Sequence, residues 1–290
     1  MRKPQPDDLR LRTGKDPTMV ETRALLLGNL ALRQAAKALP WYDANWLRYY
    51  VAALRVIELA RPSLRADFIA AFERLRTPLD YRMCKLDRVF DDTVMEQIRE
   101  LIRNLPASSL EHHEVEGFGR FVVHDHQLFN ELQKTIVPLV SDLAGEALEP
   151  AYNFLSLYRE LGVCQPHMDA PISKWTLDLC IDQSDVWPIY FSQVVPWPEN
   201  ESYDSADWQD RIKNAPTLKF SSYGLKPGEA IWFSGSSQWH YRESLAGVSA
   251  KGFCNLLFFH FLPEGMSTIA KPENWPDIFG LPELQIQQVL

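Results

Sequence analysis

The sequence predicts an α+β protein in which helices come first and a β-rich part follows. Two patterns carry this prediction. Residues 22–75 are rich in Ala and Leu at helical spacing, and after Pro150 short apolar runs are separated by Gly, Pro, Asn and Asp. Many short strands with turn signals between them are typical of a sandwich or a barrel. The charge is also divided, since residues 1–76 hold 14 basic and 8 acidic residues, whereas residues 77–290 hold 16 basic and 30 acidic ones.

Three helices are predicted in the N-terminal part, over residues 22–39, 42–60 and 63–75. Proline ends the first two, and Ser63 is a candidate cap for the third. Basic residues fall on the faces that the apolar residues leave free. We therefore expect residues 1–78 to form a basic helical extension that docks on the acidic remainder of the chain.

The remainder begins with mixed structure and then turns to strands. The pattern predicts a strand over 79–90, a helix over 91–105, a strand over 119–124 and a helix over 128–148 that is broken near Pro138. Six further strands are predicted, over residues 152–158, 174–181, 188–195, 218–222, 230–233 and 253–261. Residues 196–217 form a long acidic insertion between two of them, which is typical of a lid or binding loop and equally of a solvated hairpin.

The composition excludes several classes of protein. With 46% hydrophobic and 23% charged residues, the 290-residue chain is globular. Its larger part is acidic, so we expect no nucleic-acid partner, because binding to phosphates relies on clustered Lys and Arg. The four cysteines are far apart, which argues against a zinc ribbon or a disulfide framework. The sequence shows neither a signal-like start nor an apolar run of roughly 18 residues, so we expect a cytoplasmic protein with no membrane partner.

The residues that carry chemistry are a histidine and an aspartate two positions apart, His167 and Asp169. On a strand, residues at this spacing point to the same side, so an imidazole and a carboxylate can bind one metal ion. His240, which follows the strand-like run 230–233, is the candidate for a third ligand. Two histidines and one carboxylate form a facial triad, which leaves three positions of a six-coordinate Fe(II) open.

Three segments around these residues form a wider pattern. The first runs from Tyr158 to Asp169, and the second is the run LKPGEAIWF over residues 225–233. The third is Lys251, eleven residues after His240 at the start of an apolar run. Together they resemble the Fe(II)- and 2-oxoglutarate-dependent oxygenases, closest to the prolyl-hydroxylase-like branch. The match covers roughly residues 150–262.

This resemblance implies both a fold and a metal site. The fold is a double-stranded β-helix, a jelly roll of eight strands in two facing sheets, with its core at about residues 150–262 of a catalytic domain over 79–290. His167, Asp169 and His240 are implied as the Fe(II) ligands and the catalytic residues.

The cosubstrate implied by the resemblance is 2-oxoglutarate, whose distal carboxylate requires a cation, because a buried carboxylate without a partner is costly. The family's strand position favours Lys251. Arg242 is the alternative, since it lies two residues from His240 and a guanidinium binds carboxylates bidentately. Tyr158 is either a hydrogen-bond donor to 2-oxoglutarate or a packed core tyrosine.

The implied reaction uses O2 to hydroxylate an unactivated C–H bond of a small-molecule or amino-acid-like substrate, with release of succinate and CO2. Asp169 argues against halogenation, because related halogenases carry a small residue in its place. Two alternatives stay open: a protein or peptide hydroxylase of the same family, and a cupin-type metal enzyme that does not use 2-oxoglutarate.

Other polar residues carry weaker signals. His124, Asp125 and His126 form a candidate metal pair with no partner at a recognisable spacing. His260 alternates with phenylalanines and is either a hydrogen-bonded core histidine or part of a pocket wall. Asp178 lies close to the metal strand, where a substrate contact and a structural role are both open.

Overall fold

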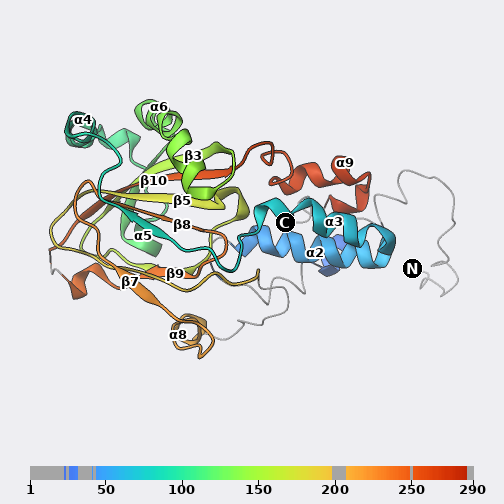
Figure 1. The fold of residues 1–290 in the computed structure, drawn as a ribbon. Coiled ribbons are helices and arrows are strands. Elements are labelled where there is room, and N and C mark those ends of the chain that lie inside the picture. The colour runs from blue at the N-terminus through green and yellow to red at the C-terminus, as the bar shows by residue number, and fades with distance from the viewer. Residues whose placement is uncertain are drawn as a thin grey trace, which may run out of the picture.

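The computed structural model describes residues 23, 26–31, 41, 44–197, 207–248 and 251–285. These residues form a mixed structure of helices and antiparallel sheets, as the sequence predicts. Figure 1 shows a strand-rich part and, at one end of it, a group of helices that contains α2 (Ala44–Ala60), α3 (Arg65–Ala71) and α9 (Trp275–Phe279). In the part of the chain that the structure describes, no helix is long and apolar enough to cross a membrane.

The larger sheet has six strands, and each neighbouring pair is antiparallel. Its order is β1–β8–β5–β10–β3–β2. The strands are β1 (Cys84–Leu86), β8 (Ala230–Phe233), β5 (Trp175–Gln183), β10 (Cys254–Pro263), β3 (Leu148–Tyr158) and β2 (Arg120–His124).

The smaller sheet has four strands in the order β4–β9–β6–β7. They are β4 (Cys164–His167), β9 (His240–Arg242), β6 (Ile189–Phe191) and β7 (Ser221–Tyr223). From β3 to β10 the chain passes from one sheet to the other at each step, except between β6 and β7, which pair within the smaller sheet. Buried residues of both sheets, such as Cys180, Ile189, Phe191, Phe233 and Leu256, pack into one cluster.

Helices cover the outer face of the larger sheet. These are α4 (Asp92–Asn104), α6 (Gln127–Thr135) and α7 (Val137–Ala144), and Figure 1 shows α4 and α6 above the strands. Successive strand residues face opposite sides. Leu257 and Phe259 of β10 therefore join the helices in one core cluster, while Phe258 and His260 face the space between the sheets.

Shorter elements complete the described chain. α5 (Val115–Phe118) precedes β2, and α8 (Trp208–Lys213) precedes β7. The 3-10 turns are Pro62–Leu64, Glu73–Leu75, Ala107–Ser109, Pro171–Ser173, Leu245–Gly247, Pro272–Asn274 and Pro282–Leu284.

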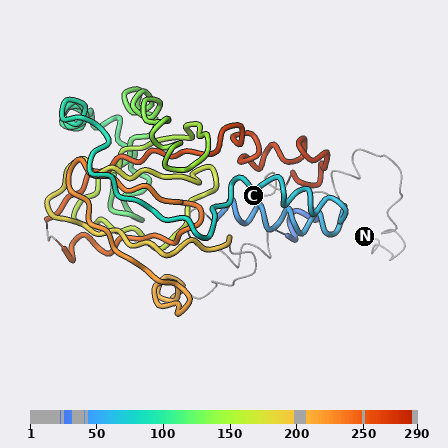
Figure 2. The backbone as a smooth tube through the Cα atoms, in the orientation of Figure 1, coloured from blue at the N-terminus to red at the C-terminus, as the bar shows by residue number. Residues whose placement is uncertain are grey.

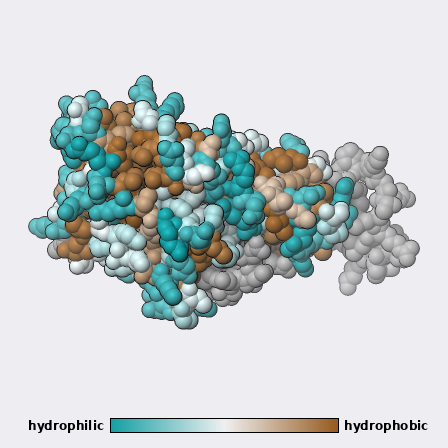
Figure 3. Space-filling view, viewed as in Figure 1, coloured by the Kyte–Doolittle hydropathy of each residue, from teal (hydrophilic) through white to brown (hydrophobic). Residues whose placement is uncertain are grey.

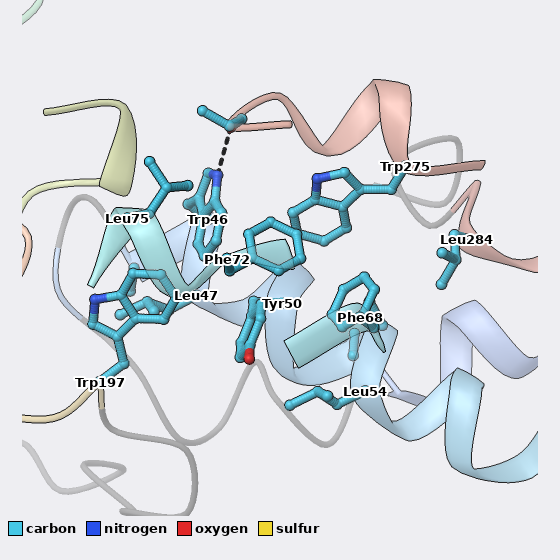
Figure 4. Packing of buried hydrophobic residues seen from close by; sticks show 14 of the residues in the cluster. Trp46, Leu47, Tyr50, Leu54, Phe68, Phe72, Leu75, Trp197, Trp275 and Leu284 are labelled. Carbon is cyan, nitrogen blue, oxygen red and sulfur yellow. Dashed lines mark hydrogen bonds between the residues drawn. The ribbon is translucent and has the colours of Figure 1, made fainter. Parts of the chain in front are cut away.

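The core of the helical end combines aromatic rings with aliphatic side chains. Figure 4 shows Trp46 and Tyr50 of α2 packed with Phe68, Phe72 and Trp275. The Trp46 and Trp275 rings are 5.4 Å apart, and the Trp46 indole N–H donates to the Ala270 carbonyl at 2.6 Å. Figure 2 shows the C-terminal segment leaving the sheet and running along α2 and α3. Trp275, Leu281 and Leu284 of this segment are thus part of the helical core.

The same core reaches the strands of the smaller sheet. Met168, which lies between His167 and Asp169, and Trp239, which precedes His240, are buried in the helical cluster. Thr77 Oγ1 lies 2.7 Å from Ser234 Oγ. The helices contact the strand-rich part through apolar and aromatic side chains, whereas Arg55 and Arg65 form ion pairs with Glu58 of α2 itself. On the face in Figure 3, apolar surface shows over both parts, between hydrophilic side chains.

Most predicted elements are confirmed, with several corrections. The strand predicted over 79–90 is limited to β1, because polar residues such as Asp80 and Asp87 flank it and only one of its edges is paired. β6 is shorter than predicted, β7 begins at Ser221 and not at residue 218, and β9 was not predicted as a strand. Ser63 does not cap a helix but lies inside a 3-10 turn. Most of the helix predicted over 22–39, and residues 198–206 of the insertion, lie outside the described residues.

Candidate metal centre

The structure brings His167, Asp169 and His240 together. His167 ends β4, His240 begins β9, and the two are direct partners in the sheet register. Asp169 follows β4, where its backbone N–H donates to the Gly235 carbonyl at 2.9 Å. One nitrogen of each histidine and one carboxylate oxygen lie within 4.8 Å of one another, and the imidazole centroids are 4.2 Å apart.

Backbone contacts fix the orientation of both imidazoles. His167 Nδ1 lies 2.8 Å from the Gln165 carbonyl, and His240 Nδ1 lies 3.0 Å from the Gln238 carbonyl. A carbonyl only accepts hydrogen bonds, so in the neutral imidazoles Nδ1 carries the hydrogen and Nε2 has a free lone pair. Both Nε2 atoms face Asp169 Oδ1, at 3.5 and 3.6 Å. Three lone-pair donors around one point fit a cation, and histidines at metal sites usually donate a hydrogen bond from the ring nitrogen that does not bind the metal.

The second carboxylate oxygen of Asp169, Oδ2, points away from the two histidine Nε2 atoms. Thr176 Oγ1 donates to Asp169 Oδ2 at 3.3 Å. Gly235 leaves the space that Asp169 occupies, since a Cβ at this position would lie 2.9 Å from Asp169 Cγ and 2.9 Å from the Ser173 carbonyl oxygen. Asp169 therefore presents Oδ1 alone to the two histidines, the arrangement that a monodentate ligand requires.

The three groups shift one another's protonation equilibria. Burial by itself would raise the pKa of Asp169, but His240 and His167 outweigh it and hold that pKa below its ordinary value. Burial lowers the pKa of His240 to about 4, and His167 acts in the same direction. Burial opposes protonation of His167 as well, but Cys164 and Asp169 raise the pKa of His167 well above its ordinary value. In the metal-free site these shifts favour a protonated His167 beside the ionised Asp169 carboxylate and a neutral His240.

A cavity of about 210 Å³ between the two sheets contains the three residues. Arg242 and Tyr158, both selected from the sequence, line the same cavity. Arg242 lies two residues after His240 on β9, donates to Asp178 Oδ2 at 2.7 Å and also donates to the Trp187 carbonyl. Burial raises the pKa of Asp178, against the opposing effect of Arg242.

A second buried cation, Arg120, also lines the cavity. Its Nη1 donates to Tyr158 Oη at 2.8 Å, and its Nε donates to Glu114. The guanidinium carbon lies 4.7 Å from the Phe118 ring centroid and 5.2 Å from that of Phe154. Tyr158 is therefore a buried hydrogen-bonded residue of the cavity wall with a cation beside it.

Comparison with known proteins gives matches at the level of structure only. No family model matches the sequence, and no curated protein matches it. The chain is similar to a solved structure of HygX from Streptomyces hygroscopicus with nickel and 2-oxoglutarate bound, at 13% identity and a TM-score of 0.47, covering 68% of this chain and 86% of that one. It is also similar to AviO1 from Streptomyces viridochromogenes Tue57, at 14% identity and a TM-score of 0.46, covering 68% and 95%.

A further similar structure is an oxidoreductase of the 2OG-Fe(II) oxygenase family from Burkholderia pseudomallei, at 13% identity and a TM-score of 0.44, covering 68% of this chain and 89% of that one. Likeness at this level carries no conclusion about what the chain does.

One residue selected from the sequence is not brought to the site. Lys251 is exposed and lines a separate surface depression with Arg159 and Glu160. β10 begins at Cys254, and the positions of β10 that face inward hold Cys254, Leu256, Phe258 and His260. The expectation that Lys251 faces the cosubstrate is therefore not supported, and Arg242 is the member of that pair in the cavity.

Sequence reasoning missed Arg120 and Thr176, which the structure places at the site, and left His260 open between a core histidine and a pocket wall. Arg120 lies on β2, and only the pairing of β2 with β3 puts it beside Tyr158. Thr176 and His260 face each other in the register of β5 and β10. The sequence holds one signal for the position of His260. It alternates with Phe259 and Phe261, which face away from the cavity, so His260 itself faces the cavity. The candidate metal pair at 124–126 is not assembled, because His124 Nδ1 lies 3.0 Å from Glu111 and His126 caps α6.

Proposed function

We propose that the chain is an Fe(II)- and 2-oxoglutarate-dependent oxygenase with a double-stranded β-helix fold. The observation that carries the proposal is the pair of imidazoles that direct both Nε2 lone pairs at Asp169 Oδ1 inside a buried cavity. Two histidines and one carboxylate with open positions are the donor set that non-haem Fe(II) oxygenases use. Strands that alternate between two four-stranded layers, β8–β5–β10–β3 of the larger sheet and the smaller sheet, support the fold.

His167, Asp169 and His240 are proposed to hold the metal, with Asp169 kept monodentate by Thr176 and Gly235. When bound, Fe(II) and 2-oxoglutarate supply the oxidising chemistry that consumes O2 and releases succinate and CO2. The protein positions the substrate and excludes water. Retention of Asp169 favours oxidation, and hydroxylation first of all, over halogenation.

Arg242 is proposed as the cation for the distal carboxylate of 2-oxoglutarate. It lies two residues beyond His240 on the same face of β9, about 7 Å along the strand at the usual rise per residue. Asp178 fixes the guanidinium, and its raised pKa allows it to take up a proton when a second carboxylate arrives. Arg120 with Tyr158 is the competing anion site in the cavity.

The substrate is proposed to be a small molecule or an amino-acid-like compound. The cavity of about 210 Å³ is smaller than the roughly 300–1,000 Å³ of pockets that enclose drug-sized ligands. A protein or peptide hydroxylase of the same kind needs an open groove for a chain, which a cavity of this size does not favour. A cupin-type enzyme without 2-oxoglutarate would use the triad but not the cation at Arg242.

An anaerobic titration tests the proposed function. Fe(II) followed by 2-oxoglutarate should produce a visible charge-transfer band, and on admission of air 2-oxoglutarate should be converted to succinate. Iron binding without any response to 2-oxoglutarate would favour the cupin-type alternative. Absence of both iron and 2-oxoglutarate binding would exclude the proposal.

A further inference from the structure

His260 connects the cavity wall to a residue of the metal centre. It lies on β10 opposite Thr176 of β5, and its Nδ1 lies 3.1 Å from Thr176 Oγ1. Thr176 in turn donates to Asp169 Oδ2 at 3.3 Å. Thr176 and His260 are 1% and 3% exposed, so water has little access to this chain of hydrogen bonds.

The hydrogens of this chain can be placed by counting donors. A threonine hydroxyl has one hydrogen, and an ionised carboxylate only accepts. Because the Thr176 hydrogen goes to Asp169, the hydrogen in the other bond belongs to His260 Nδ1. Burial lowers the pKa of His260 to about 4, so its imidazole is neutral at pH 7. Nε2 of His260 is therefore an acceptor.

That acceptor is unsatisfied within the described chain. His260 Nε2 is buried and has no hydrogen-bond partner there, although buried polar atoms in folded proteins are nearly always paired. The imidazole lines the cavity that contains the metal centre. An orphaned acceptor at the wall of a binding cavity indicates a place for a donor that comes with a ligand.

The surroundings of His260 are aromatic. Tyr152 stacks on its imidazole, with centroids 4.3 Å apart, and Phe154 stacks on Phe258 at 4.8 Å. All four side chains line the cavity. We call Tyr152, Phe154 and Phe258 the aromatic wall. A wall of ring faces around one acceptor fits a molecule with an apolar body and an O–H or N–H group.

We propose that His260 has two roles: through Nδ1 and Thr176 it positions Asp169, and through Nε2 it accepts a hydrogen bond from a hydroxyl, amine or amide group of the substrate. The apolar body of that substrate lies against the aromatic wall. The inference rests on the proposed function where it calls the ligand the substrate and Asp169 a metal ligand. It adds the substrate class, a small compound whose O–H or N–H group lies near its apolar body.

Two substitutions separate the roles. His260→Asn keeps a nitrogen donor near the position of Nδ1 and removes the group at Nε2, whereas His260→Gln places an amide near Nε2 and removes the donor at Nδ1. Each variant is loaded with Co(II), whose visible absorption reports coordination without turnover. Binding of phenol and of anisole, which lacks the O–H donor, is then compared by ligand-observed NMR. Thermal melts confirm that both variants fold.

We expect His260→Asn to bind Co(II) like the wild type and His260→Gln to bind it about tenfold more weakly or worse, with an altered spectrum. Wild type and His260→Gln should prefer phenol to anisole by roughly three- to tenfold, the worth of one hydrogen bond, and His260→Asn should lose the preference. Thr176→Val should reproduce the Co(II) defect, and Thr176→Ser should not.

The inference is overturned if His260→Asn and His260→Gln both change Co(II) binding and the phenol preference together, or if neither variant changes either readout. It is also overturned if the wild type shows no preference for phenol over anisole, whether both compounds bind or neither does. Failure of the proposed function is distinguishable, because it shows as absence of Co(II) and Fe(II) binding in the wild type itself. The phenol preference does not require metal, so it is measured on the metal-free protein as well.

Discussion

Substitution of Gly235 by Ala is expected to disable the proposed metal centre although none of its three ligands is replaced. The added Cβ would collide with Asp169 Oδ2 and lie 2.9 Å from both Asp169 Cγ and the Ser173 carbonyl oxygen, closer than real Cβ atoms come to such neighbours. The backbone cannot simply withdraw, because the Gly235 carbonyl accepts the Asp169 N–H at 2.9 Å. Overpacking of this kind costs about 1–3 kcal/mol of stability, and displacing the support of a ligand costs about 10–100-fold in metal affinity.

The assay is an anaerobic Fe(II) titration of Gly235→Ala, with chemical denaturation in parallel. Gly247→Ala is the matched control, since an added Cβ there meets nothing within 4 Å and Gly247 lies away from the centre in a 3-10 turn. We expect weaker iron binding and lower stability in the first variant and no change in the second. Wild-type iron affinity in Gly235→Ala would refute the geometry inferred for Asp169.

Three further outcomes follow from the same geometry. Arg242→Met should weaken 2-oxoglutarate binding by roughly 10–100-fold, as expected for hydrogen bonds to a charged group. Lys251→Ala should leave this binding unchanged. The reverse pattern in the charge-transfer titration would show that Lys251 binds the distal carboxylate of 2-oxoglutarate. The pKa of His167 is raised well above its ordinary value, so metal binding near pH 7 should displace a proton from His167. The apparent metal affinity should therefore fall as the pH is lowered. Calorimetry in buffers of different ionisation enthalpy measures the proton release, and absence of this release would contradict a protonated metal-free site. Trp46→Ala should cost about 3–5 kcal/mol and shift one cooperative unfolding transition of the whole chain, whereas two separate transitions would show that the helical end folds on its own.

The grouping of His167, Asp169 and His240 was predictable because its signal is local. His167 and Asp169 are two residues apart, and the Pro227–Gly228 turn before β8 marks the segment that leads to His240. The structure shows that Asp169 lies beyond the end of β4. The two-residue spacing correctly predicted that the side chains of His167 and Asp169 lie together. The position of Asp169, however, is fixed by its backbone hydrogen bond to Gly235 and not by the strand.

The rest of the site depends on sheet pairing, which the sequence does not display. Arg120 reaches Tyr158 because β2 pairs with β3, and His260 reaches Thr176 because β10 pairs with β5. Lys251 was misleading because spacing after His240 fixes neither where β10 begins nor which of its residues face inward.

The helical end illustrates the same limit at larger scale. The boundary near residue 78 stays a prediction, and Trp275, assigned from the sequence to the catalytic part, packs on Trp46 and Phe72. Apolar residues at helical spacing predict that a face is buried, but they do not identify the partner that buries it. The partner here includes the C-terminal segment and the residues that adjoin two metal-site histidines, Met168 and Trp239.

The iron content of an isosteric ligand variant tests the metal centre most directly. Wild type and Asp169→Asn are loaded anaerobically with Fe(II), desalted, and analysed for iron per chain. We expect one iron per chain in the wild type and its loss in Asp169→Asn, because the amide keeps the shape of Asp169 and removes its charge. Equal, tightly held iron in both proteins would contradict the assignment of His167, Asp169 and His240 as the ligands.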